Sequence, residues 1–187
     1  MNYRKSTYIT LILFICNALF IKAQVIIGDP NKVAYENDTE SVLLQFSTSE
    51  NRGLILPYVR EYPSNITEGT ILLDARDPQG ARVRYYNGEW IDLSQQSADI
   101  TSALQNQPEL GVGDADKAKV IIGNATTSAD GVLVLESQTQ AMVLPMVNDY
   151  KDIINPSPGM MVFINKAGSK RLAVFNGSKW SFWKGKD

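Results

Sequence analysis

The sequence predicts an all-β protein built from two tandem small β-rich modules with Asn-Gly hairpins, joined by a polar linker. Three observations support this fold class: short β-branched and aliphatic runs lie between Gly, Pro, Ser and Asn residues, a helical period is lacking, and the chain repeats itself. We assign residues 24–93 to the first module, residues 94–119 to the linker and residues 120–187 to the second module.

The internal repeat consists of five landmarks that recur in the same order. A short aliphatic run ending in Gly comes first, then an aliphatic step ending in Pro, a Gly before an apolar strand, an Asn-Gly turn and a Trp. The landmarks are Val25–Gly28 and Val120–Gly123, Leu54–Pro57 and Met142–Pro145, Gly69 and Gly159, Tyr85–Gly88 and Val174–Gly177, and Trp90 and Trp180. Ordered recurrence of this kind is hard to obtain by chance and indicates two copies of one supersecondary unit.

Each copy is expected to contain three short apolar strands before its hairpin. The expected strands are Val42–Phe46, Leu54–Val59 and Ile71–Asp74, with counterparts at Val132–Leu135, Met142–Val147 and Met160–Ile164. Pro57 and Pro145 have no N–H group to donate to a ladder, so we expect each of them at a strand end or on a sheet edge.

The Asn87-Gly88 pair predicts the first hairpin, because both residue types tolerate positive φ. A two-residue loop would place Tyr85 opposite Trp90, and Val83 opposite Asp92. A bulged register is the alternative, and the sequence leaves it open.

The second hairpin has one more residue, Lys179, between its Asn-Gly pair and its Trp. A three-residue loop would place Val174 opposite Trp180 and Leu172 opposite Phe182, which gives an apolar face. The bulged alternative stays open here too.

The segment 94–119 is polar and holds few large apolar residues. Ser97 is a candidate cap for a short helix with Ile100 and Leu104 on one side, ended by Pro108 and Gly111. We interpret the segment as a linker with one or two helical turns.

Residues 1–23 have the pattern of a secretory signal peptide: Arg4 and Lys5 precede an apolar stretch, and Ala23 offers a small residue for cleavage before Gln24. The apolar stretch is shorter than the roughly 20 residues that span a bilayer, which favours a cleaved signal over a membrane anchor. We therefore expect an exported protein, extracellular or at the cell surface or outer membrane, without a transmembrane span after cleavage.

Composition excludes several classes of chemistry. The 187-residue chain has no His, and its single Cys, Cys16, lies in the leader. Imidazole catalysis, His-ligated zinc, disulfides and thiol nucleophiles are therefore not expected. The formal net charge of −2 gives no support to nucleic-acid binding.

Two acidic pairs are candidates for catalysis or metal binding, Asp74 with Asp77 and Asp114 with Asp116. Neither pair has the further ligands and Gly spacing of a calcium loop, so turn and linker solvation is the better interpretation. We expect no catalytic residue, no metal, no cofactor and no enzymatic activity.

The hairpin aromatics are the remaining candidates for contacting an interface or a ligand: Tyr85, Tyr86, Trp90, Phe175, Trp180 and Trp183. Flat aromatic faces stack on sugar rings or dock proteins. The competing interpretation is that half of them close the module core or a subunit interface, since one face of each hairpin must be buried.

The order of these elements resembles the N-terminal modules of secreted Bacteroidota surface proteins, including those with tail-fibre domains. The resemblance lies in Gln24–Gly28, Leu54–Pro57, Gly69–Asp74 and Tyr85–Trp90, with their partners in the second copy. It implies a structural role in assemblies that are commonly trimeric.

We expect a structural or adhesive surface protein, or an accessory subunit, that acts through self-association, as a homotrimer for example, or through contacts with other surface proteins. The alternative is a carbohydrate-binding module that holds glycans on the aromatic hairpin faces.

Overall fold

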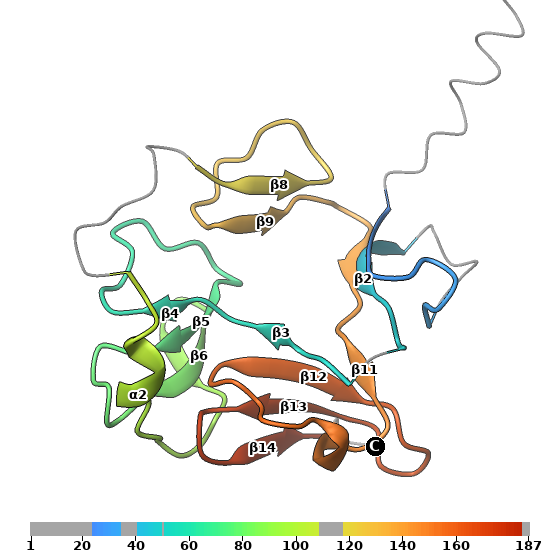
Figure 1. The fold of residues 1–187 in the computed structure, drawn as a ribbon. Coiled ribbons are helices and arrows are strands. Elements are labelled where there is room, and N and C mark those ends of the chain that lie inside the picture. The colour runs from blue at the N-terminus through green and yellow to red at the C-terminus, as the bar shows by residue number, and fades with distance from the viewer. Residues whose placement is uncertain (1–23, 35–40, 50, 109–117, 185–187) are drawn as a thin grey trace, which may run out of the picture.

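The computed structural model describes residues 24–34, 41–49, 51–108 and 118–184, and these residues form an almost entirely β structure (Figure 1). The predicted signal peptide, residues 1–23, lies outside the described residues. The strands of the first copy are β1 (Val25–Ile27), β2 (Val42–Phe46), β3 (Leu54–Ile55), β4 (Tyr58–Val59), β5 (Ile71–Asp74), β6 (Arg82–Tyr86) and β7 (Trp90–Asp92). Those of the second copy are β8 (Val120–Ile122), β9 (Leu133–Leu135), β10 (Ala141–Met142), β11 (Met146–Val147), β12 (Met160–Ile164), β13 (Arg171–Phe175) and β14 (Trp180–Trp183).

The two copies form the same strand pairs. In the first copy β1 pairs with β2 and β4 with β5 in parallel, while β5–β6 and β6–β7 are antiparallel. In the second copy β8–β9 and β11–β12 are parallel, while β12–β13 and β13–β14 are antiparallel. The all-β fold class is confirmed, and the sequence repeat is also a repeat of strand pairing.

The two expected proline-containing strands are each interrupted at the Pro. Pro57 lies between β3 and β4, and Pro145 between β10 and β11. Each proline carbonyl still accepts a ladder hydrogen bond, from the N–H of Leu73 (2.9 Å) and of Phe163 (2.9 Å) respectively. The expectation that both prolines lie at strand ends is confirmed.

Two further pairings join the copies to each other. β3 pairs antiparallel with β12, with Leu54 opposite Met161 and Ile55 opposite Met160. β10 pairs in parallel with β2, with Met142 opposite Leu44. One sheet therefore has the order β1-β2-β10, and the sheet β11-β12-β13-β14 takes β3 on β12 (Figure 1). The boundaries at residues 93 and 120 mark repeats in the sequence, while two of the sheets combine strands from both copies.

The core is shared in the same way. Leu56, Leu73 and Val83 of the first copy pack in one buried cluster with Met161 and Val174 of the second. A second buried cluster lies on the other face of β12 and β13 and includes Val147, Ile153, Val162, Ala173 and Phe175. The sheet of the second copy is therefore apolar on both faces, which explains why its strands are continuous apolar runs.

Side chains near the second hairpin dock it onto the segment that follows β7. Asn176 is fully buried; its side-chain amide donates to the carbonyl of Gln96 (2.7 Å), and its Oδ1 accepts from the N–H groups of Ser178 (3.0 Å) and Lys179 (2.9 Å). The hydroxyl of Ser181 donates to the carbonyl of Ser94, and the indole N–H of Trp183 donates to that of Leu93 (2.8 Å).

The first part of the predicted linker belongs to the core. Ser94, Ala98 and Ile100 are buried, and Ala98 forms a β-bridge with Ala81. One helical turn, α2 (Thr101–Leu104), follows, as the linker interpretation allowed. Its cap is not Ser97: the helix begins after Ile100, and the Asp99 carboxylate accepts from the Thr101 N–H (2.9 Å). Gly111 lies outside the described residues.

The register expected for the first hairpin is wrong by one residue. Trp90 lies opposite Tyr86, not Tyr85, and Asp92 lies opposite Arg84, not Val83. The reason is the environment of Asp92: this register keeps its carboxylate off the face of Val83, which is fully buried against Leu73, and leaves it paired with Arg82. Leaving Asp92 unpaired on the apolar face would be costly.

The register expected for the second hairpin is also wrong by one residue. Trp180 lies opposite Phe175, and Phe182 lies opposite Ala173. The four-residue loop lets the Asn176 side chain bond the turn. It also separates the two faces, because Ser181 now lies opposite Val174. The rings of Phe175, Trp180 and Phe182 therefore pack together in the second cluster. The small side chain of Ser181 points to the other face, toward Ser94.

We predict that Asn176→Ala lowers the free energy of unfolding by about 1–3 kcal/mol, because the change leaves buried partners without a hydrogen bond. Asn87 is the matched control: it occupies the same hairpin position in the first copy but is exposed, so Asn87→Ala should change stability by less than about 0.5 kcal/mol. Urea unfolding followed by circular dichroism measures both variants. Equal losses would show that the hydrogen bonds of the Asn176 side chain contribute nothing to stability.

Candidate functional site

The first candidate region is an aromatic group at the end of the first hairpin. Tyr86 and Trp90 lie opposite each other, with ring centroids 5.3 Å apart in an edge arrangement. Tyr62, from the loop after β4, stacks on Trp90 with centroids 4.6 Å apart and planes at 21°. The Arg76 guanidinium lies 3.6 Å from the centre of the Tyr62 ring. Trp90 is half-buried, and one face of its ring is occupied by Tyr62.

Tyr85 is not part of this group. It lies opposite Ile91 and Ile71, on the other face of the hairpin, because adjacent strand residues point to opposite sides. The structure therefore brings together two of the three predicted aromatics of this hairpin, and adds Tyr62, which sequence reasoning missed. A single Tyr in a loop carries no periodic signal that could have identified it.

The second candidate region is an aromatic group at the other hairpin. Phe175 and Trp180 lie opposite each other with centroids 5.2 Å apart. Tyr150 contacts Phe182 (5.1 Å) and Trp180 (6.0 Å) from the 3₁₀ turn η1 (Tyr150–Asp152). These rings pack on the second core cluster. Trp183 lies apart from them, 37% exposed, with its indole N–H bonded to Leu93.

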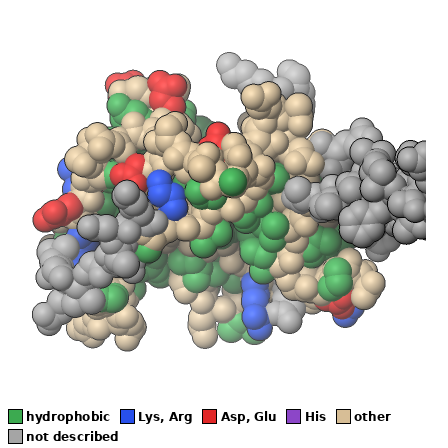
Figure 2. All heavy atoms as spheres, turned by 90° about the horizontal axis from the view of Figure 1, so that it is seen from above, with side chains coloured by type: hydrophobic (Ala, Val, Ile, Leu, Met, Phe, Trp, Pro, Cys, Tyr) green, Lys and Arg blue, Asp and Glu red, His purple; other side chains and the backbone are tan. Residues whose placement is uncertain are grey.

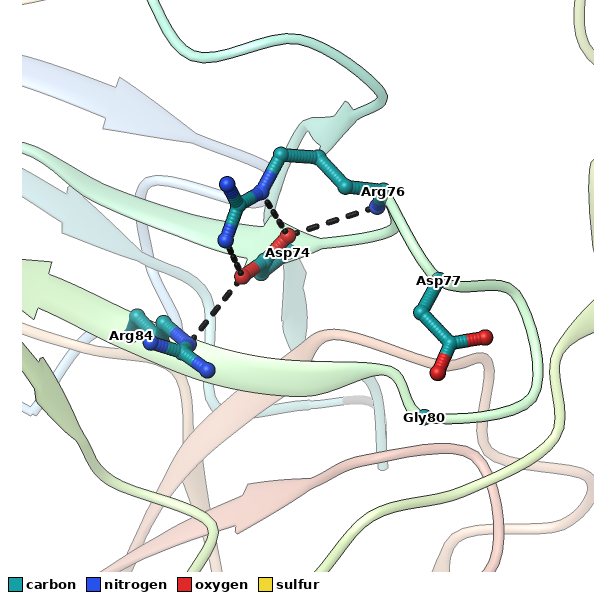
Figure 3. A pocket seen from close by; sticks show the side chains of 5 residues that line it. All are labelled: Asp74, Arg76, Asp77, Gly80 and Arg84. Atoms are coloured by element: carbon teal, nitrogen blue, oxygen red, sulfur yellow. Dashed lines mark hydrogen bonds and ion pairs between the residues drawn. The ribbon is translucent and has the colours of Figure 1, made fainter.

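A polar depression surrounds Asp74, at the end of β5 (Figure 3). Arg76 donates to its carboxylate from Nε (2.9 Å) and Nη2 (3.0 Å), and the Arg84 Nε lies 3.1 Å from the same group. The hydroxyl of Tyr62 donates to it as well (2.8 Å). Burial disfavours the charged form, but the hydrogen bonds from Arg76 and Tyr62 outweigh this effect and hold the pKa of Asp74 below its ordinary value.

This arrangement suits a structural role for Asp74. The carboxylate is surrounded by donors and stays ionised, so it is a poor general acid. In Figure 3 the Asp77 side chain points away from Asp74, and its carboxylate accepts from the Gln79 N–H (3.0 Å) within the turn. The interpretation of Asp77 as a turn residue agrees with this contact. The expectation that Asp74 is solvated is wrong, because its carboxylate is buried among Arg76, Arg84 and Tyr62. Asp114 and Asp116 lie outside the described residues.

Within the described part of the chain, no three His, Cys, Asp or Glu side chains gather closely enough to hold a metal ion. Residues 24–34, 41–49, 51–108 and 118–184 contain no helix with the length and apolar character required to span a bilayer.

A third candidate region is the strand pair β8–β9, which lies apart from the other sheets (Figure 1). Val120 in β8, Leu133 in β9 and Val132 directly before β9 are 57%, 41% and 58% exposed. Figure 2 shows apolar side chains gathered across the middle of the face seen from above. The sequence predicts Val132–Leu135 as a strand, but its exposure could not be predicted, because the counterpart strand Val42–Phe46 is also apolar and is buried.

Comparison with known protein families gives one finding. Residues 121–186, roughly a third of the chain, match the family model described as a phage tail like trimerisation region. The matched residues begin in β8 and include β9 and the aromatic second hairpin. No match was found among curated proteins or among solved structures.

We predict that Asp74→Asn destabilises the protein by about 1–3 kcal/mol at neutral pH, because Arg76, Arg84 and Tyr62 lose a charged partner. A carboxyl whose folded pKa is depressed stabilises the protein above its unfolded pKa of about 3.9 and loses this effect as the pH falls through the folded pKa. The difference between the wild type and Asp74→Asn should therefore be constant from about pH 5 to 8 and shrink below about pH 4.

Urea unfolding at a series of pH values measures this difference. Asp77→Asn is the matched control, since Asn can still accept the Gln79 bond, and it should behave like the wild type throughout. A difference that persists unchanged to the lowest pH would show that the charge of Asp74 is not the stabilising element.

Proposed function

We propose that the protein is a non-enzymatic structural protein that assembles as a homotrimer, with the second copy as its main assembly region. The observation that carries this proposal is the match of residues 121–186 to a phage tail like trimerisation region. That match includes most of the strand pair β8–β9, and it supports the tail-fibre resemblance, which implies trimeric assemblies.

The energetics of the single chain favour association. Val120, Val132 and Leu133 are aliphatic and largely exposed, and fully burying such a side chain contributes about 1.5–3 kcal/mol. Short strands with open edges also tend to pair with another chain unless they are covered. A trimer that covers β8 and β9 would remove both liabilities.

The chemistry of the described residues supports a structural role over a catalytic one. The depression around Asp74 is lined by an internal ion-pair network, in which the Asp74 carboxylate pairs with Arg76 and Arg84. The hairpin rings mostly contact one another or the core. Export to the cell surface or the extracellular space, with an adhesive or accessory role there, is part of the proposal and is supported by the leader pattern of residues 1–23.

Light scattering coupled to size exclusion tests this proposal on residues 24–187. We expect three chain masses over a wide range of protein concentration, and the same mass at 1 M salt, because an apolar interface is not screened by ions. A monomer at all concentrations would contradict the proposal. It would then favour the alternative of glycan binding at the aromatic hairpins.

A further inference from the structure

The strand pairs that join the two copies define edges at which a further copy can join. In the first copy β2 has β1 on one edge and β10, from the second copy, on the other. In the second copy β9, the equivalent of β2, has β8 on one edge. Among the residues that the structure describes, no strand pairs with the other edge of β9.

Burial shows the effect of this missing strand. Leu43 and Leu44 of β2 are 1% and 0% exposed. The parallel registers with β1 and β8 place Val132 and Leu133 at the same two positions of the second copy, where they are 58% and 41% exposed. Aliphatic residues at equivalent positions differ in burial because one position has a neighbouring copy and the other has none.

A second sheet edge also differs between the two copies, but here the first copy is the one that lacks a neighbouring strand. The first half of β12 is covered by β3, and Met160 and Met161 are buried there. Their equivalents at β5 are Thr70 and Ile71, which are only half-buried. Within the described residues, no strand lies against this half of β5.

Two equivalent glycines support this comparison. A Cβ at Gly159 would lie 3.5 Å from the carbonyl oxygen of Leu56, because the end of β3 passes there and the Leu56 N–H donates to Gly159 (3.1 Å). A Cβ at Gly69, the counterpart of Gly159, would meet nothing within 4 Å. The space next to Gly69 is open in the single chain where the equivalent space is filled.

The two strands that join the copies, β3 and β10, can each pair with a strand on both of their edges. β10 donates to β2 from Ala141 (2.7 Å, to Ser41) and from Val143 (2.8 Å, to Leu44). The end of β3 donates to β12 from Leu56, whose equivalent is Leu144. Successive backbone groups of a strand point to opposite edges, so β3 and β10 use different edges for their observed partners. Each of the two strands can therefore take a second partner.

We propose that a second copy of this chain docks head to tail through two strand pairs that repeat the internal junction. β10 of one chain pairs antiparallel with the open half of β5 of the next chain, and β3 of that next chain pairs in parallel with β9 of the first. The internal registers place Val143 opposite Thr70, as Ile55 lies opposite Met160, and Leu54 opposite Leu133, as Met142 lies opposite Leu44.

This inference rests on the proposed self-association and specifies its geometry. The interface is heterologous: two different surfaces meet, so it closes as a ring or continues as a filament. Three chains would close a ring in which first and second copies alternate. We assign a second copy of this chain as the partner because both proposed strand pairs repeat pairs that the two copies already form within one chain, β3 with β12 and β10 with β2.

Engineered cysteines test the register, since residues 24–187 contain no native Cys. Directly opposed residues of antiparallel strands have Cα atoms about 4.5–5.5 Å apart, which suits a disulfide. Chains carrying Thr70→Cys and chains carrying Val143→Cys, co-expressed and oxidised, should form covalent mixed dimers on a non-reducing gel. The double variant Thr70→Cys/Val143→Cys should give bands up to three chain masses, and each single variant expressed alone should stay monomeric on the gel.

The controls separate this inference from the proposed trimer. Ile154→Cys paired with Val143→Cys should give no disulfide, because Ile154 is 85% exposed and outside both junctions. A trimer by light scattering without the Thr70–Val143 disulfide would overturn the inference and leave the proposed function standing. Disulfides in either single variant alone would indicate a two-fold interface and also overturn it, whereas a monomer would contradict the proposed function as well.

Charge substitution gives a measurement that needs no cross-link. Leu133→Asp should convert the trimer to monomer, because it places an unpaired carboxylate in the junction, whereas Ile154→Asp should leave the mass unchanged. Leu133 is already 41% exposed in the single chain, so the circular dichroism spectrum of the monomer should be retained. Retention of the trimer by Leu133→Asp would overturn the inference.

Discussion

The exchange of strands between the two copies is the constraint on which the rest of the fold depends. β3 and β10 are two residues long, too short to form stable sheets, and each completes a sheet of the other copy. Because β3 covers β12, Met161 can join the cluster that contains Leu56 and Leu73. The described residues contain no cysteine, so burial takes the place of disulfides, and this exchange creates a buried cluster to which both copies contribute.

Polar side chains in this fold mainly fix backbone positions. Asp74 is held by Arg76, Arg84 and Tyr62 at the end of β5, and Asp92 accepts from Ser94 after β7. Asn176 connects the second hairpin to Gln96. Each of these contacts orders a segment that has few apolar residues of its own. This use of charge and hydrogen bonding agrees with the structural role proposed for the chain.

The internal repeat allows equivalent residues of the two copies to be compared within one chain. Leu44 and Leu133 occupy equivalent positions, yet the first is fully buried and the second is exposed. Intrinsic preference cannot explain the difference, since both are Leu in equivalent parallel pairs. The neighbouring strand is the variable, and the same comparison applies to Gly159 and Gly69. An exposed Leu by itself would indicate little, because isolated apolar residues are common on protein surfaces.

The sequence by itself determined the elements of each copy. Val42–Phe46, Ile71–Asp74 and Met160–Ile164 are strands over the expected residues, both prolines directly precede a strand, and both hairpins turn at Asn-Gly. These features depend on β propensity, the missing proline N–H and tolerance of positive φ, which are local properties. Four of the six predicted aromatics, Tyr86, Trp90, Phe175 and Trp180, also came together in pairs as hairpin neighbours.

The tertiary structure alone decided which partners those elements have. The hairpin registers allow Asp92 to pair with Arg82 and Ser181 to bond with Ser94. Rules based on the turn residues alone do not take these partners into account. Tyr62 and Tyr150 reach the aromatic groups from loops, and β3 and β10 cross between copies. The pattern of a strand predicts which of its residues are apolar. Two copies with the same pattern therefore predict the same pairings, and they do not show which strand edges have a neighbour. Only the packing of the whole chain determines which edges are covered and which stay open.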